Sequence, residues 1–81
     1  MSALNLNYRH LYYFWVVAKE GGVTRAAERL GVAVQTISMQ LSLLEKAVGK
    51  TLFAPQGRRL VLTEAGRLAL NYADQIFLLG E

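Results

Sequence analysis

Apolar side chains recur at helical spacing along most of this chain, and glycines separate the periodic segments. The first segment, residues 7–20, starts at Asn7, a favourable N-cap, and is followed by Gly21 and Gly22. Its aromatic and β-branched residues also fit a strand, but strands usually extend over only about five or six residues, so the length of this run favours a helix. Because apolar residues occupy most of its circumference, this helix is predicted to need two packing partners.

Two further helices are predicted next, separated by a very short turn. Thr24 is a good N-cap for a helix that ends at Leu30, and Gly31 suits the left-handed conformation that follows a helix. The third helix is predicted over residues 34–48, before Gly49. Four apolar residues share one face: Ile37, Leu41, Leu44 and Val48. The opposite face carries Gln35, Ser38, Met39, Ser42 and Lys46.

A small β-hairpin is predicted after these helices. Residues 51–54 and 59–62 are β-prone, and residues 55–58 between them have the composition of a turn. Arg58 and Arg59 would lie at the tip. Since a hairpin of two strands is marginal alone, we expect it to lean on the helices.

Thr63 is predicted to cap a last helix that reaches toward Gly80, with Gly66 as a weak point near its start. Apolar residues line two sides of this helix: Ala65, Ala69, Tyr72, Ile76 and Leu79 on one, and Leu70 and Phe77 on the other. This is more apolar surface than so short a chain can cover. We therefore expect the sequence to be the N-terminal part of a longer protein.

Composition narrows the classes of function. The 81 residues (9.0 kDa) hold one domain at most, and 53% hydrophobic residues suffice for one small core. The absence of cysteine excludes a disulfide and a cysteine zinc site, and His10, the single histidine, cannot hold a metal alone. The longest apolar run, residues 11–18, is far shorter than the roughly 20 residues that span a bilayer. We expect a cytoplasmic protein with no membrane association, no cofactor and no enzymatic activity.

The strongest functional signal is the helix pair TRAAERLGVAVQTISMQLSLLE, residues 24–45. A helix-turn-helix needs small residues where the helices approach, a turn residue that tolerates positive φ, and apolar residues at the crossing. Residues of these kinds are present: Ala26, Ala27, Gly31, Leu30, Val32 and Ile37. This geometry offers the second helix to the major groove of B-DNA, about 12 Å wide. Uncharged groups suited to base edges follow the turn: Gln35, Thr36, Ser38 and Gln40.

The alternative is a helical protein-interaction module, in which the helix pair is an ordinary αα corner and the apolar last helix docks a partner without any DNA. Two arginines at a turn, taken alone, are better explained by solubility. Helix-turn-helix followed by a basic hairpin, however, is a winged helix, whose tip reaches a phosphate backbone or a minor groove. The negative potential of a narrow minor groove attracts arginine. The order of the three elements therefore favours DNA binding.

The ordered motifs TRAAERLGV, QTIS, QL..LE, G..LF and GRR..LTEAG, after an aromatic first helix, resemble the N-terminal DNA-binding domain of LysR-type transcriptional regulators over nearly the whole chain. The opening YRHLYYFWVVAKEGGV is most similar to the branch that contains the sodium/proton antiporter regulator. The resemblance implies a mainly α fold: a winged helix-turn-helix over residues 1–62 with a small two-stranded wing, and a long C-terminal linker and dimerisation helix over residues 63–81.

The same resemblance implies a bacterial regulator that binds double-stranded DNA sequence-specifically as a homodimer, tetrameric at full length, with a small-molecule inducer bound by a C-terminal domain outside this chain. By position it implies a DNA surface made of Thr24, Arg25, Val34, Gln35, Thr36, Ser38, Met39, Ser42, Lys46, Arg58 and Arg59. The recognition helix would enter the major groove and the wing the minor groove. The implied dimerisation surface comprises Tyr12, Tyr13, Trp15, Ala65, Ala69, Tyr72, Ile76 and Leu79.

Two positions depart from the family pattern. Ala33 and Val34 stand where many members have Ser followed by Gln, and the lost cap should cost about 1 kcal/mol of helix stability. Val34 can offer only an apolar contact, for example to a thymine methyl group. Met39 stands where an Arg is common, so one guanine or phosphate contact is expected to be missing.

Overall fold

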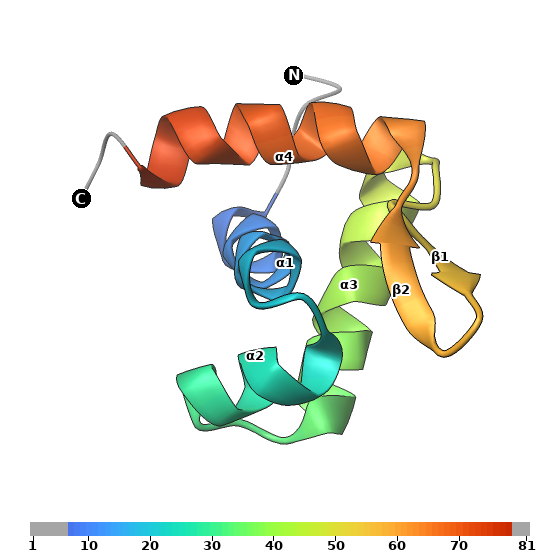
Figure 1. Cartoon of the computed structure of the whole chain (residues 1–81). Coiled ribbons are helices and arrows are strands. Elements are labelled where there is room, and N and C mark those ends of the chain that lie inside the picture. Colours follow the sequence, from blue (N-terminus) through green and yellow to red (C-terminus); the bar gives the residue numbers. More distant parts are fainter. Residues whose placement is uncertain (1–6, 79–81) are drawn as a thin grey trace.

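Four helices and one β-hairpin follow one another in the predicted order (Figure 1). The computed structural model describes residues 7–78. Its elements are α1 (Tyr8–Glu20), α2 (Val23–Leu30), α3 (Val34–Val48), β1 (Phe53–Gln56), β2 (Arg59–Leu62) and α4 (Glu64–Phe77). The mainly α fold with a two-stranded wing is therefore confirmed.

The ends of α1 are set by the residues that the sequence points to. The side-chain oxygen of Asn7 accepts hydrogen bonds from the backbone N–H groups of Arg9 (2.8 Å) and His10 (3.2 Å). At the other end Gly21 adopts φ 83°, and its N–H bonds to the carbonyl of Val17. These caps satisfy backbone groups that a helix leaves open, and they explain why the aromatic run is a helix and not a strand.

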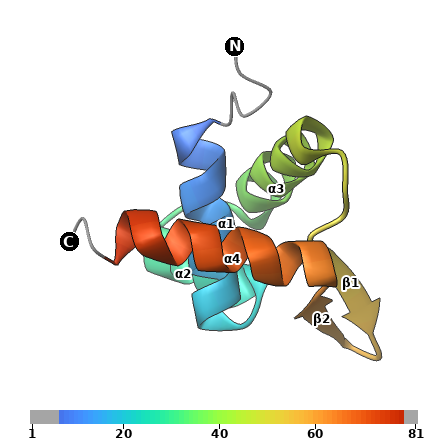
Figure 2. The same cartoon turned by 90° about the horizontal axis from the view of Figure 1, so that it is seen from above.

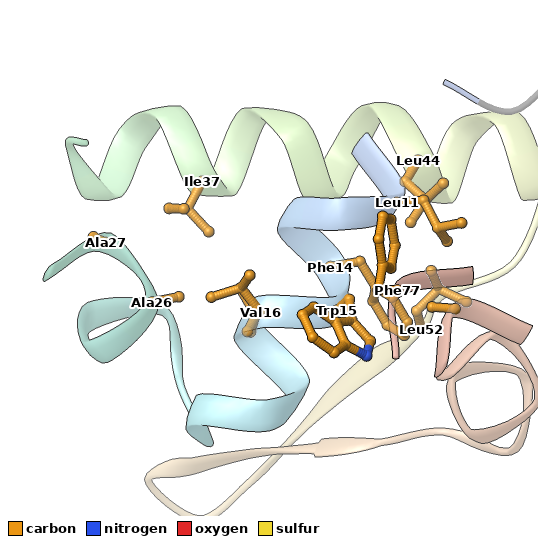
Figure 3. Close-up of a cluster of buried hydrophobic side chains, with 12 residues drawn as sticks. Leu11, Phe14, Trp15, Val16, Ala26, Ala27, Ile37, Leu44, Leu52 and Phe77 are labelled. Atoms are coloured by element: carbon orange, nitrogen blue, oxygen red, sulfur yellow. The ribbon is translucent and has the colours of Figure 1, made fainter. Parts of the chain in front are cut away.

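Helix α1 lies at the centre of the molecule and is buried on most of its circumference. It packs against α2, α3 and α4, one neighbour more than its pattern required. Figure 3 shows Ile37 and Leu44 pointing from α3 toward α1, with Ala26 reaching it from α2. The buried residues of α1 itself are Leu11, Phe14, Trp15, Val16 and Val17. This shared core fixes the orientation of α3 relative to the rest of the chain.

Helix α2 starts earlier than predicted. Its N-cap is Gly22, not Thr24, because the Gly22 carbonyl already accepts the N–H of Ala26 (3.2 Å). Thr24 is exposed within the first turn and supplies no capping bond.

The hairpin is tighter and starts later than predicted. Its antiparallel register pairs Phe53 with Leu62 and Gln56 with Arg59, which leaves a two-residue turn in which Gly57 has φ 65°. A positive φ at the first central position matches the II′ turns that suit the twist of a hairpin. Pro55, expected in the turn, lies inside β1, where an edge strand tolerates the missing N–H.

Helix α4 crosses over α1, with β2 leading into its start (Figures 1 and 2). As predicted, Thr63 caps it: the hydroxyl oxygen accepts the Gly66 N–H at 2.9 Å. Gly66 is not the expected weak point, because a Cβ there would overlap the carbonyl oxygen of Leu52. Ala73 and Phe77 join the core, so α4 is packed on the helical body along the length that the structure describes.

Candidate nucleic-acid interface

The turn between α2 and α3 has the geometry that a helix-turn-helix requires. Gly31 adopts φ 70°, and its N–H bonds to the carbonyl of Ala27 at 2.8 Å. The N–H of Val32 bonds to the same carbonyl at 3.1 Å. Ala26 has no exposed surface and Ala27 has 5%, so the two helices approach closely at this end. Together these features close α2 and redirect the chain into α3 within three residues.

The outward face of α3 is the face predicted from the sequence. Ile37 and Leu44 are buried, whereas the opposite side is open to solvent. Val34 is 42% exposed and Met39 63% exposed. The other exposed members of this face are Gln35, Ser38, Ser42 and Lys46. Every one of these side chains is accessible to a partner.

Two polar residues of α3 lie differently from the rest. Consecutive residues of a helix are rotated by about 100°, which places Thr36 and Gln40 together on the flank of the outward face. Thr36 is half-buried. Gln40 is also half-buried, and its Oε1 is enclosed with no hydrogen-bond partner among the described residues. Gln40 was expected to reach base edges; its carbonyl oxygen is turned into the protein here, and a contact of Gln40 with DNA stays a prediction.

Helix α3 begins without a side-chain cap, as its sequence predicts. Ala33 is the N-cap, and its carbonyl accepts the N–H groups of Thr36 (3.0 Å) and Ile37 (3.3 Å). Its methyl group offers no acceptor for the first amides of the helix. The start of α3 is therefore held by the turn and by the burial of Ile37.

The basic residues divide into paired and unpaired groups. Lys19 lies 3.0 Å from Asp74, and Arg29 lies 2.9 Å from Glu20. The other seven are exposed and form no salt bridge among residues 7–78: Arg9 on α1, Arg25 on α2, Lys46 on α3, Lys50 just after α3, Arg58 and Arg59 on the hairpin, and Arg67 on α4. Lys50 was not predicted from the sequence, because it lies beyond the end of α3 and helical periodicity therefore assigns it to no face. With Ser42, Lys46 and Thr51 it lines a shallow, open groove.

Glu45, the only acidic residue of α3, has a structural role. Its carboxylate accepts the backbone N–H of Leu52 at 2.8 Å and that of Phe53 at 3.4 Å. It therefore joins the end of α3 to the start of β1, and two N–H dipoles offset its negative charge. The sequence does not reveal this role, because the partners of Glu45 are backbone groups seven and eight residues away.

The hairpin is fixed at its base and free at its tip. The Thr63 hydroxyl donates to the Thr51 carbonyl at 2.7 Å, and the Thr63 N–H donates to the Leu52 carbonyl at 3.0 Å. From this base the strands project away from the helical body, with the turn at the free end (Figures 1 and 2). Arg58 and Arg59 are exposed there. The fold thus presents two cationic side chains on an anchored arm.

The surface predicted for dimerisation is partly apolar and open. Tyr72 is 49% exposed, while the remaining described positions except Trp15 are half-buried against the core: Tyr12, Tyr13, Ala65, Ala69 and Ile76. Leu68, missed in the sequence, is 67% exposed and lies one turn before Tyr72. Leu79 lies outside the described residues.

Trp15 is not part of that surface, contrary to expectation. Its side chain is 3% exposed, and its Nε1 donates to Oδ1 of Asp74 at 2.8 Å. The ring of Trp15 packs against that of Phe77, with centroids 5.3 Å apart. The indole therefore joins α1 to α4 within one chain.

The hydrogen bond from Trp15, followed by the contact with Lys19, lowers the pKa of Asp74 from its ordinary value of 3.8. The carboxylate therefore stays charged at neutral pH. Across residues 7–78, no cluster of acidic or histidine side chains could hold a metal ion, and no helix is both long and apolar enough to cross a membrane.

Comparison with known proteins places this geometry in a family. Residues 8–67 match the family described as "Bacterial regulatory helix-turn-helix protein, lysR family". The chain is 47% identical over 81 residues to the transcriptional activator protein NhaR of Escherichia coli, covering all of this chain and 27% of that protein. It is thus about a quarter as long as this relative.

Solved structures agree with the family match. The DNA-binding domain of CbnR in complex with DNA superposes with a TM-score of 0.83 at 36% identity, covering 93% of this chain and 86% of that one. The DNA-binding domain of BenM, in complex with catB site 1 DNA, superposes with a TM-score of 0.82 at 32% identity, covering 88% and 80% of the two chains. The chain described here therefore belongs to the LysR family of bacterial regulatory helix-turn-helix proteins.

Proposed function

We propose that this chain is the sequence-specific DNA-binding domain of a transcriptional regulator, with α3 in the major groove of double-stranded DNA and the hairpin in the minor groove. One observation carries the proposal: the outward face of α3 is exposed, polar at Gln35 and Ser38, and free of acidic side chains up to Glu45. A helix of this kind can approach a polyanion and still present hydrogen-bonding groups to base edges.

The chemistry of α3 separates base reading from charge neutralisation. Gln35 lies in its first turn, where recognition helices contact bases, and a glutamine can bond adenine through two groups at once. Lys46 and Lys50 lie at the far end of the helix, where their ammonium groups suit phosphates. Arg25 and Thr24, exposed in the first turn of α2, suit the backbone beside the groove. Sequence selectivity would then come from the start of α3, and affinity from its surroundings.

The hairpin suits a second contact. Arg58 and Arg59 are exposed at the tip of an arm whose base is held by Thr63 and Glu45. A guanidinium group inserted into a narrow minor groove is favoured by the negative potential there. Because the arm is anchored, less conformational freedom is lost on binding than with a mobile loop.

The relatives support this assignment. NhaR is described as a transcriptional activator, and the CbnR and BenM domains were solved in complexes with DNA. This chain shares the family and the fold of those proteins. That NhaR is much longer supports a regulator with a further domain, which would bind a small-molecule inducer and allow tetramers to form.

We also propose that the chain acts as a homodimer through α4. Leu68 and Tyr72 expose apolar surface on successive turns of this helix, and Tyr8 at the start of α1 is 64% exposed. A pair of chains related by a two-fold axis would cover this surface. Its two α3 helices would address half-sites about 34 Å apart or a multiple of that distance.

Gln35→Ala and Arg59→Ala, compared on the same DNA, test the proposal. The DNA is a duplex that the domain enriches from genomic fragments, beside a shuffled duplex of equal composition. Gln35→Ala should weaken binding to the enriched duplex by about 1–3 kcal/mol and leave binding to the shuffled one almost unchanged. Arg59→Ala should weaken both and reduce the salt dependence of the binding constant by about one unit at most.

The outcomes exclude the alternatives. Equal losses on both duplexes for Gln35→Ala would contradict base reading by α3, and an unchanged salt slope for Arg59→Ala would remove the hairpin from the interface. Failure to form any saturable, selective complex at about 0.15 M salt would favour a helical protein-interaction module instead.

Sedimentation of the domain over a range of concentrations tests the dimer. Leu68→Glu should shift the domain toward the monomer, because a charge would be buried in an apolar interface. Val48→Glu, an equivalent change on a residue 39% exposed at the end of α3, should leave the association unchanged. Identical association of both variants would contradict an interface on α4.

A further inference from the structure

Of the four exposed large apolar side chains of α3, which are Val34, Met39, Leu43 and Val48, the first two lie directly beside its polar reading groups. Val34 precedes Gln35 in the chain, and Met39 lies one turn after Gln35 on the same side of the helix. Val34 is 42% exposed and Met39 is 63% exposed, so neither side chain joins the apolar core on the buried side of α3. Isolated exposed apolar residues are common on proteins. These two differ because they occupy the surface that, in the proposed function, meets the bases.

The charges of α3 restrict what this surface can read. From Val34 through Leu44 no residue is charged. Arginine or lysine paired with the two acceptors of guanine is the commonest specific contact in the major groove, and this stretch cannot supply it. The groups it does supply match an A·T pair: an amide for the N6 and N7 positions of adenine, and apolar carbon for the methyl group of thymine.

Resting on the proposed function, we propose that α3 selects A·T pairs and that Met39, assisted by Val34, recognises the C5 methyl group of thymine. Gln35 lies between them and bonds the adenine edge. Met39 suits the task because its side chain is unbranched and adapts to an irregular apolar surface. Cytosine lacks the methyl group, and guanine presents two acceptors that no apolar side chain satisfies.

Replacing thymine by deoxyuridine isolates this contact, because the two bases differ only in the methyl group. The domain is first used to enrich binding sequences from random duplexes made with thymine. The strongest duplex is then prepared again with deoxyuridine at one thymine at a time. Loss of a buried methyl group should weaken binding about fourfold at each contacted thymine.

Three variants assign the effect to the side chains. Met39→Leu keeps an apolar side chain and should keep the fourfold preference for thymine over deoxyuridine. Met39→Gln places an amide there, and Val34→Ala removes most of the apolar contact beside it. At one or more positions, these last two variants should bind thymine and deoxyuridine duplexes equally well. Because the changes are exposed, folding should be preserved, which circular dichroism checks.

Each result has a definite meaning. Equal binding of thymine and deoxyuridine duplexes by the unaltered domain would overturn the inference and leave the proposed function intact. The same would follow if Met39→Gln and Val34→Ala kept the full preference, because the methyl group would then act through another residue or through DNA shape. Failure to enrich any duplex would contradict the proposed function, and this inference with it.

Discussion

Replacing Gly66 by alanine reverses the usual effect of this substitution in a helix. Alanine is ordinarily favoured over glycine inside a helix by about 1 kcal/mol. At Gly66, in the first turn of α4, a Cβ would overlap the carbonyl oxygen of Leu52 and press on the side chain of Leu62. The Leu52 carbonyl cannot move freely, because it accepts the N–H of Thr63 at 3.0 Å.

The size of the effect follows from these opposing contributions. Overpacking in a well-packed region costs about 1–3 kcal/mol, and contact with fixed backbone places this site at the upper end. Subtracting the helical preference for alanine leaves a net loss of about 2 kcal/mol in the free energy of unfolding. In a domain of this size that loss lowers Tm by roughly 8–16 °C.

Thermal and urea unfolding followed by circular dichroism measure the difference. Gly22→Ala is the matched control, because no atom lies within 4 Å of the Cβ that it would add and the backbone there is extended. Because Gly22 is the N-cap of α2 and alanine is a poorer cap than glycine, this control should cost less than about 1 kcal/mol. A Gly66→Ala variant as stable as the unaltered chain, or more stable, would refute the close approach of α4 to the base of the hairpin.

Two further predictions concern side chains that join distant elements. Glu45→Ala leaves the partly buried N–H of Leu52 without its acceptor, and it should lower the free energy of unfolding by about 1–3 kcal/mol in urea titrations. Glu28→Ala, a change at an exposed position, should have little effect. Equal effects of the two variants would contradict the anchoring role of Glu45. For Asp74, whose pKa is lowered by Trp15 and Lys19, the stabilising charge is fully present above pH 3.8 and is lost as the pH falls through the folded-state pKa. The unaltered chain should therefore be more stable than Asp74→Asn at neutral pH, with the difference shrinking below pH 3.8, and a pH-independent difference would count against the charged contact.

Local sequence signals predicted most of the helical skeleton. The bounds of α1 and α3 follow from one capping asparagine, Asn7, and from glycines in the left-handed conformation at Gly21 and Gly49. Such caps act within a few residues, and a single sequence displays them. The outward face of α3 was equally predictable, because helical periodicity alone separates Ile37 and Leu44 from Gln35 and Ser38.

The errors arose where tertiary contacts decide the outcome. Trp15 was assigned to the dimer surface by the resemblance, whereas its indole N–H bonds to Asp74, which lies 59 residues away in the sequence. Gly66 looked like a weakness because its close neighbour, Leu52, lies in another segment. The enclosed oxygen of Gln40 was equally hidden from the sequence, because the chemistry of an amide does not reveal which way its oxygen is turned. Helical periodicity predicts on which face of its helix a residue lies, but the contacts of its side chain depend on how the helices pack.

In the proposed complex, the start of α3 and the tip of the hairpin form one surface for duplex DNA. Amide chemical-shift mapping tests it most directly, with the isotopically labelled domain titrated with the enriched duplex. We predict that the largest perturbations fall on residues 34–42 and 57–59, with smaller ones near Lys46 and Arg25. Perturbations centred on Leu68 and Tyr72 of α4, with α3 and the hairpin unaffected, would contradict the account.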